Sequence, residues 1–141
     1  MPAREFVDSN IWLHALVLAG DAGADQKHHR ASDLLNRVDR PVINSQIVRE
    51  VCSNLLKKAK LGEADVQRVI QDWYLTCELH PSSEQQHLLA SRLRETASFS
   101  FWDSLIVAAA LDAGCSTLYS EDMQHGQVIE GRLTIANPLL G

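Results

Sequence analysis

Short apolar segments alternate with longer amphipathic ones along most of this chain. The short segments are bounded by polar residues or turn formers and contain β-branched or aromatic side chains, a pattern that is typical of strands. We predict five strands from them, at residues 6–7, 41–43, 75–79, 117–119 and 133–135. Strands this short and apolar indicate a parallel sheet that is covered on both faces.

The longer segments carry apolar residues at intervals of three and four, which predicts helices. The first helix carries residues 11–17 after a cap at Ser9 or Asn10, and the glycine-containing stretch 20–23 ends it. The others are predicted at residues 25–38, 45–60, 63–73, 83–97 and 102–113. Alternating strands and helices predict a three-layer α/β/α sandwich around a five-stranded parallel sheet. The length of 141 residues predicts one domain, residues 1–141.

Composition changes this picture little. Hydrophobic residues make up 45% and charged residues 22%, as in an ordinary globular protein. The net charge of −5 does not mark the whole molecule as a binder of nucleic acid, although basic residues can still cluster locally. The candidates for such patches, which are equally well explained as solvated helix faces, are Arg92, Arg94, Lys57, Lys58 and Lys60.

The cysteines and the N-terminal segment favour a cytoplasmic protein. Cys52, Cys77 and Cys115 form no CxxC pair and lie in apolar or helical stretches, so we expect buried free thiols in a reducing compartment. The N-terminal residues show no signal-peptide pattern. The longest apolar run, residues 105–111, is too short to span a bilayer. We therefore expect no contact with a membrane.

Four acidic residues occupy positions that folding alone would not favour: Asp8, Glu50, Asp103 and Asp122. Asp8 and Asp122 follow predicted strands, and ligands of parallel sheets bind beyond the carboxyl ends of the strands. Two carboxylates about 4 Å apart repel each other by roughly 4 kcal/mol at an effective dielectric constant of about 20. A cluster of them therefore predicts a hard divalent cation, Mg²⁺ or Mn²⁺.

Each of these acids also has a structural explanation. Asp8 can cap the helix that follows it. Glu50 lies at the border of the apolar stripe of its helix, where it is either a metal ligand or a surface side chain, free or paired with Arg49. Asp103 fits a capping box with Ser100, and a carboxylate there also interacts well with the helix dipole.

The fourth acid, Asp122, lies in a polar turn after a strand, which ordinary turn chemistry also explains. We expect only one of Glu121 and Asp122 to face the cleft. The hydroxyl group of Ser120 is placed to orient a neighbouring carboxylate. Local sequence leaves both interpretations of each acid open, and only their joint placement favours a site.

Several other classes of active site are not supported. The chain has no HExxH, GxGxxG, GxxxxGK[ST] or GxSxG motif, and the pair His28 and His29 is predicted to lie on a helix surface. A haloacid-dehalogenase-type phosphatase expects a second aspartate where Asn10 stands. A response-regulator receiver expects a lysine after a late strand, and the last lysine here is Lys60.

The acid motifs, taken in order, resemble those of PIN-domain ribonucleases, and specifically of VapC-type toxins of toxin–antitoxin pairs. The resemblance covers almost the whole chain. The segments that carry it are FVDSN at 6–10, IVREV at 47–51, FWDSLIVAAA at 101–110, LYSEDMQ at 118–124 and IANP at 135–138.

The resemblance implies a five-stranded parallel sheet between helices and a metal-dependent endoribonuclease site. The implied site residues are Asp8, Glu50, Asp103 and Asp122, with Asn10 and Ser120 matching supporting polar positions. It also implies an RNA substrate, a homodimer, and a cognate antitoxin protein whose C-terminal segment binds near the acids. The alternative is a catalytically silent PIN-like domain that binds RNA or another protein.

Overall fold

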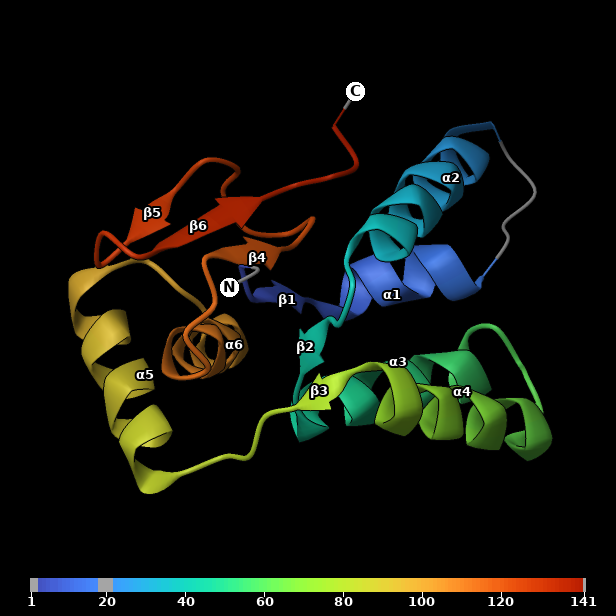
Figure 1. The fold of residues 1–141 in the computed structure, drawn as a ribbon, viewed down its shortest axis with the longest axis horizontal. Helices are drawn as coiled ribbons and strands as arrows, with labels where there is room; N and C mark the ends of the chain where they lie inside the picture. Colours follow the sequence, from blue (N-terminus) through green and yellow to red (C-terminus); the bar gives the residue numbers. More distant parts are fainter. Residues whose placement is uncertain (1–2, 18–21, 141) are drawn as a thin grey trace.

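The computed structural model describes residues 3–17 and 22–140 and consists of helices around a central sheet (Figure 1). The strands are β1 (Glu5–Val7), β2 (Val42–Ile43), β3 (Glu78–Leu79), β4 (Thr117–Tyr119), β5 (Val128–Ile129) and β6 (Leu133–Ala136). The helices are α1 (Ser9–Leu16), α2 (Ala22–Arg37), α3 (Ser45–Lys57), α4 (Glu63–Thr76), α5 (Glu84–Thr96) and α6 (Phe101–Asp112).

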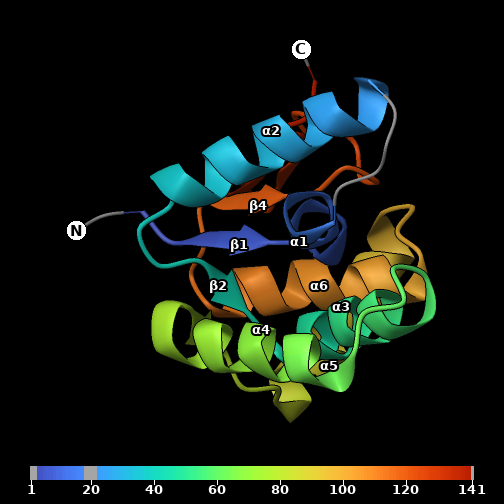
Figure 2. The same cartoon turned by 90° about the vertical axis from the view of Figure 1, so that its right-hand side faces the viewer.

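The strands form one sheet in the order β3-β2-β1-β4-β6-β5. All neighbouring pairs are parallel except β5 and β6, which are antiparallel. Figure 2 shows β1 and β4 between α2 on one side and α6 on the other. The predicted three-layer α/β/α architecture is therefore confirmed, and the parallel part of the sheet has the five predicted strands.

The third strand is shorter than predicted, because α4 continues through its first residues. The N–H group of Cys77 donates to the carbonyl of Trp73 at 2.8 Å, which completes the last helical turn. Leu75 is 76% exposed on this helix, so it is not part of a buried strand. Only Glu78 and Leu79 pair with β2.

The antiparallel edge strand β5 was not predicted. It pairs with β6 through a tight turn in which Glu130 and Gly131 have positive φ angles of 51° and 64°. The N–H group of Arg132 closes this turn by donating to the carbonyl of Ile129 at 3.1 Å. Two consecutive residues with positive φ are typical of hairpin turns, and glycine adopts this conformation readily.

Other helix boundaries also differ from the prediction: α1 begins at Ser9 and is capped by Asp8, not by Ser9 or Asn10, and α6 begins at Phe101. Helix α3 ends at Lys57, and Lys60 has a positive φ angle of 55° in the connection that follows. Helix α2 begins at Ala22, earlier than the predicted residue 25. The predicted break at residues 20–23 falls partly on residues 18–21, which lie outside the described residues.

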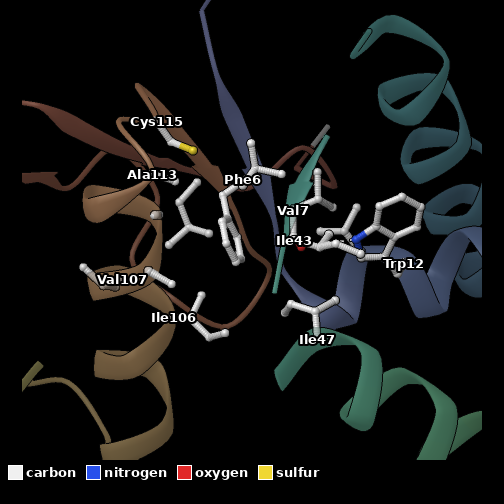
Figure 3. Packing of buried hydrophobic residues seen from close by; sticks show 14 of the residues in the cluster. Phe6, Val7, Trp12, Ile43, Ile47, Ile106, Val107, Ala113 and Cys115 are labelled. Carbon is white, nitrogen blue, oxygen red and sulfur yellow. Dashed lines mark hydrogen bonds between the residues drawn. The ribbon is translucent and has the colours of Figure 1, made fainter. Parts of the chain in front are cut away.

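The core lies between the sheet and its helices. Phe6 and Val7 of the central strand β1 are fully buried, and Figure 3 shows them between Ile106 and Val107 of α6 and the side of α1 and α3. Burying an aliphatic or aromatic side chain of this size stabilises the fold by about 1.5–3 kcal/mol. This packing fixes where β1 ends and therefore where Asp8 lies.

The topology gathers three helix N-termini at one edge of the sheet. Helices α1 and α3 directly follow β1 and β2, so they begin at the carboxyl edge of those strands. Helix α6 precedes β4 and runs back along the sheet, so that its N-terminus lies at the same edge. Helix N-termini carry a partial positive charge and stabilise nearby anions. This edge is therefore suited to acidic side chains.

The sequence predicted buried free thiols and no contact with a membrane. Cys52, Cys77 and Cys115 are free thiols, the last two buried and Cys52 half-buried. Burial raises the pKa of the Cys115 thiol to about 11, so this thiol is inert at neutral pH. Among the helices of the described ranges, none has the length and hydrophobicity needed to cross a membrane.

Candidate functional site

Asp8 lies at the centre of the carboxyl edge and is 5% exposed. Its N–H group donates to the carbonyl of Tyr119 at 2.9 Å, which extends the pairing of β1 with β4 by one residue. One carboxylate oxygen accepts from the N–H group of Ser9 and the other from the hydroxyl of Ser120, both at 2.8 Å. Asp8 therefore caps α1, as one interpretation of the sequence predicted, and its carboxylate also lies near those of Glu50 and Asp103.

The environment of Asp8 disfavours its ionised form. Burial is the largest cause that raises the pKa of Asp8 to about 6, and the negative charges of Glu50 and Asp103 raise it further. The hydrogen bonds from Ser120 and Ser9 act in the opposite direction without cancelling the effect of burial. A buried carboxylate beside other carboxylates needs a positive partner to ionise fully at neutral pH.

Glu50 reaches the same edge from the second turn of α3. The neighbouring side chains Ile47 and Val51 are fully buried, which turns Glu50 toward α1. Its Oε2 accepts from the hydroxyl of Ser9 at 3.3 Å, whereas its Oε1 is buried and has no hydrogen-bond partner. The alternative pairing with Arg49 is not formed, because neither residue belongs to an ion pair of the described chain.

Asp103 lies in the first turn of α6, and Ser100 is the N-cap. The hydroxyl of Ser100 accepts from the N–H group of Asp103 at 3.1 Å, as the predicted capping box requires. Burial raises the pKa of Asp103, the charge of Asp122 raises it further, and a hydrogen bond with Ser100 opposes both. The capping group is thus Ser100, and the carboxylate of Asp103 faces the other acids.

Asp122 is held at the edge by the two polar residues that the sequence marked as supporting. Asn10 donates from Nδ2 to Oδ2 of Asp122 at 2.9 Å and accepts from the N–H group of Glu121 at 3.1 Å. The hydroxyl of Ser120 accepts from the N–H group of Asp122 at 3.3 Å. Two hydrogen bonds with Asn10 therefore fasten the loop after β4 to α1, and the bond to Ser120 braces the loop internally.

Glu121 points away from the cluster. Its carboxylate accepts from His14 at 2.8 Å and from Lys27 at 2.6 Å. Burial acts to raise the pKa of Glu121, but the hydrogen bonds and charges of Lys27 and His14 together lower it. Of the two acids after β4, Asp122 is the one beside Asn10, and Glu121 links this loop to α1 and α2.

The four acids form an electrostatically coupled cluster. Glu50 and Asp103 both raise the pKa of Asp8, and Asp122 raises that of Asp103, so each acid is close enough to another to repel it. These residues come from α3, the β1–α1 junction, α6 and the loop after β4. Within the described chain, none of these four acids forms an ion pair with a basic residue.

The residues of the cluster fit a hard divalent cation by their chemistry. All four side chains offer carboxylate oxygens, which such cations prefer as ligands. The Oε1 atom of Glu50 is buried without a hydrogen-bond partner, and a cation would stabilise it there. Within residues 3–17 and 22–140, no group of three or more His, Cys, Asp or Glu side chains is arranged so that it could hold a metal ion.

Two supporting contacts were missed by sequence reasoning. Ser9 was considered only as a helix cap, whereas its hydroxyl orients Glu50. Arg94 donates to the buried hydroxyl of Ser104 at 2.7 Å, and that hydroxyl donates to the carbonyl of Phe101 at 2.6 Å. This pair fixes the first turn of α6, which carries Asp103. No local pattern signals either contact, since each partner lies on a different element or turn.

Ser120 offers a direct test of how the cluster is held together. Its fully buried hydroxyl bonds both Asp8 and the backbone of Asp122, so Ser120→Ala leaves a buried carboxylate oxygen without a donor. We expect a loss of about 1–3 kcal/mol in the free energy of unfolding, measured by urea denaturation at neutral pH. Ser116→Ala, at an exposed position just before β4, is the matched control and should change it by less than about 0.5 kcal/mol. Equal effects of both substitutions would contradict the assigned role.

Fold and site together define a class: a parallel α/β domain with a cluster of carboxylates at the carboxyl edge of its sheet. The chain belongs to the PIN domain family, whose family model matches residues 6–129. The resemblance stated from the sequence motifs is therefore confirmed at the level of the family. A search of curated proteins gives no significant match.

Solved structures with the same fold include two toxins or toxin complexes. A toxin–antitoxin complex from Klebsiella pneumoniae is similar with a TM-score of 0.68 and 18% sequence identity, over 96% of this chain and 98% of that one. VapC20 of Mycobacterium tuberculosis, a toxin that cleaves the sarcin–ricin loop, is similar with a TM-score of 0.66 and 19% identity, over 84% and 89% of the two chains. At these identities the likeness establishes the shared fold.

Proposed function

We propose that this protein is a metal-dependent endoribonuclease and the toxin of a toxin–antitoxin pair. The observation that carries the proposal is the coupled cluster of Asp8, Glu50, Asp103 and Asp122 at the carboxyl edge of a PIN domain, with one buried carboxylate oxygen left unpartnered. The similarity of the fold to a toxin–antitoxin complex and to the toxin VapC20 supports the proposal. In this proposal, residues 1–141 form a single PIN domain.

The proposed reaction is hydrolysis of an RNA phosphodiester bond. Asp8, Asp103 and Asp122 would hold Mg²⁺ or Mn²⁺, and Glu50 would be either a further ligand or the group that orients the attacking water. When bound, the cation would neutralise the phosphate and lower the pKa of a coordinated water. Ser120 and Ser9 hold Asp8 and Glu50 in place through their hydroxyl groups. Asn10 holds Asp122 at the same edge.

The proposal includes the partners and the location expected from the sequence. A cognate antitoxin would bind near the acids and block the site, as befits a fold shared with a toxin–antitoxin complex. A homodimer and a cytoplasmic location complete the proposal. The three free thiols are compatible with a reducing compartment.

Cleavage of a single-stranded RNA by the purified protein tests the proposal. We expect cleavage with Mg²⁺ or Mn²⁺, none with EDTA, and recovery when the metal is added back in excess. Attack by water leaves a phosphate on one new end and a hydroxyl on the other, without a 2′,3′-cyclic phosphate. Mass spectrometry of the products therefore separates this activity from a contaminating metal-independent ribonuclease.

Two outcomes would contradict the proposal. Cleavage that resists EDTA and leaves cyclic phosphates would mean that the carboxylates are not the active groups. Binding of RNA without cleavage at millimolar Mn²⁺ would favour the alternative, a silent PIN-like domain. Calorimetric titration with Mn²⁺ distinguishes a protein that binds the metal without turnover from one that does not bind it.

A further inference from the structure

A groove adjoins the carboxylate cluster along α3 and the first turn of α6. Two neighbouring hollows of about 330 and 390 Å³ make up this groove, which we call the α3–α6 groove. Both are lined by Gln46, Arg49 and Trp102, and the second also by Glu50. The first extends to Ser82 and His87 of the β3–α5 region. The groove therefore begins at an acid of the candidate site and leads away from it.

Trp102 forms one wall of the groove and is 64% exposed, whereas Trp12 and Trp73 are 8% and 2% exposed. A single exposed aromatic side chain is common on protein surfaces and carries no argument by itself. Trp102, however, lines the same hollow as Glu50. Its exposed side chain therefore lies beside the cluster at which a phosphodiester would react.

Trp102 is also held in position. Gln46 of α3 donates to its carbonyl oxygen at 3.4 Å, and the ring of Phe101 meets its indole edge-on with centroids 5.1 Å apart. The guanidinium of Arg94 lies 4.7 Å over the Phe101 ring and bonds Ser104 of the same turn. Contacts from α3 and α5 thus hold the backbone turn that carries Trp102, and the Phe101 ring contacts its indole.

Arg49 supplies a positive charge to a groove whose neighbouring site is negative. Its side chain is exposed, lines both hollows, and makes no ion pair within the described residues. It directly precedes Glu50 on α3. An unpaired guanidinium beside an aromatic face is the combination that binds a phosphate and its base in single strands.

We propose that the α3–α6 groove is a subsite for one nucleotide of single-stranded RNA next to the cleaved bond, with its base stacked on Trp102 and its phosphate bound by Arg49. This inference rests on the proposed function and adds a nucleotide contact to it, which needs an unpaired base, because a base within a duplex has no free face for an indole. The side chains of Ser82 and His87 line the far end, where they could bond the base edge.

The lining of the groove favours RNA over a protein segment. A docked amphipathic helix would need a row of apolar anchors. Around Trp102 the groove instead presents the guanidinium of Arg49, amides, hydroxyls, an imidazole and, at the end next to the cluster, the carboxylate of Glu50; Leu105 is the other apolar side chain of its lining.

Tryptophan fluorescence tests the proposal, because Trp102 is the exposed one of the three tryptophans. The probe is a single-stranded hexamer of adenylate, titrated in Ca²⁺, which prefers oxygen ligands but binds them in a looser geometry than Mg²⁺. We expect saturable quenching by this hexamer and none by a hexamer of abasic ribose phosphates at the same concentration. Equal quenching by both would overturn the proposal.

Substitutions then assign the two contacts. Binding measured by anisotropy of a labelled hexamer is expected to weaken by about tenfold in Trp102→Ala and to be largely retained in Trp102→Phe. Arg49→Gln should weaken binding and reduce the dependence of log K on log salt by about one. Tyr74→Ala, a 62% exposed aromatic residue on α4 outside the groove, is the matched control and should bind as the unsubstituted protein does.

Cleavage kinetics separate this proposal from the proposed function. With Mg²⁺, Trp102→Ala should raise KM by about tenfold with little change in kcat. Cleavage with an unchanged KM would refute the subsite while leaving the nuclease intact. Trp102-dependent binding without any cleavage would refute the nuclease while leaving the subsite intact. Loss of self-association in Trp102→Ala, with RNA binding unchanged, would assign the groove to a protein contact and overturn the proposal.

Discussion

Replacing Asp8 with asparagine is expected to slow RNA cleavage by about 1,000-fold or more without unfolding the protein. The charges of Glu50 and Asp103 both act on Asp8, which lies at the end of the central strand. Removing its charge would weaken cation binding where the phosphate reacts. A loss of about 4 kcal/mol of transition-state stabilisation corresponds to about 1,000-fold in rate.

The fold should tolerate Asp8→Asn because the substituted side chain has the same shape. Its amide oxygen can still accept from the N–H group of Ser9, and its amide nitrogen can donate to the hydroxyl of Ser120, which reverses that hydrogen bond. Circular dichroism and the elution volume on gel filtration are therefore expected to match those of the unsubstituted protein.

The rate should be measured as initial cleavage of a labelled single-stranded RNA at saturating Mg²⁺. Asp65→Asn is the matched control, since Asp65 is a carboxylate on α4 that pairs with Arg68 at the surface. It should retain full activity. A purified Asp8→Asn protein that cleaves within about tenfold of the unsubstituted rate would exclude Asp8 from the reaction.

The place of Asp8 could be predicted because its signal is local. Phe6 and Val7 are apolar and fully buried, so the strand ends at the polar residues that follow. The same holds for Asp122, which follows β4 closely, and for Glu50, whose spacing from Ile47 and Val51 puts it at the border of a buried stripe. In a parallel sheet the ends of such elements meet at one edge.

What the sequence did not reveal depends on contacts between distant residues. The hydrogen bonds from Asn10 to Asp122 and from Ser120 to Asp8 each join residues 112 positions apart. Nothing near Glu121 in sequence shows that it pairs with His14 and Lys27 and leaves the cleft to Asp122. These choices are made by tertiary packing.

The end of α4 shows the same limit within secondary structure. Residues 75–79 have the alternation of a strand, yet α4 continues to Thr76, past the buried Trp73 that packs on Trp12 with ring centroids 5.6 Å apart. Likewise, the edge strand β5 depends on its pairing with β6 and not on its own two residues.

The metal-free protein is expected to become less stable as the pH rises from about 4 to above 6. The pKa of Asp8 is about 6 in the folded protein, against a usual value of 3.8. The unfolded chain therefore releases this proton at lower pH than the folded protein does. Below about pH 4 both states are protonated and no stability is lost, whereas above about pH 6 the folded state carries an unfavourable charge that costs about 3 kcal/mol.

Asp103 should add to this trend, since its pKa is also raised in the folded protein. Glu121 should oppose it, because its pKa is lowered and its contribution to stability is present above its usual pKa and lost as the pH falls. Glu121→Gln is therefore expected to destabilise the protein at neutral pH and to have its smallest effect in acid, the opposite sign to a substitution of Asp8.

Asp8→Asn isolates the contribution of the buried charge. In EDTA at pH 7.5 this variant should be more stable than the unsubstituted protein by up to about 3 kcal/mol, and the difference should vanish near pH 4. The measurement is the free energy of unfolding by urea at several pH values. Saturating Mn²⁺ should reverse the order, since the unsubstituted protein gains the binding energy of the cation and the variant gains much less. If the substitution destabilised the metal-free protein at every pH, Asp8 would serve mainly as a helix cap. Repulsion between its carboxylate and the neighbouring carboxylates would then not lower the free energy of unfolding.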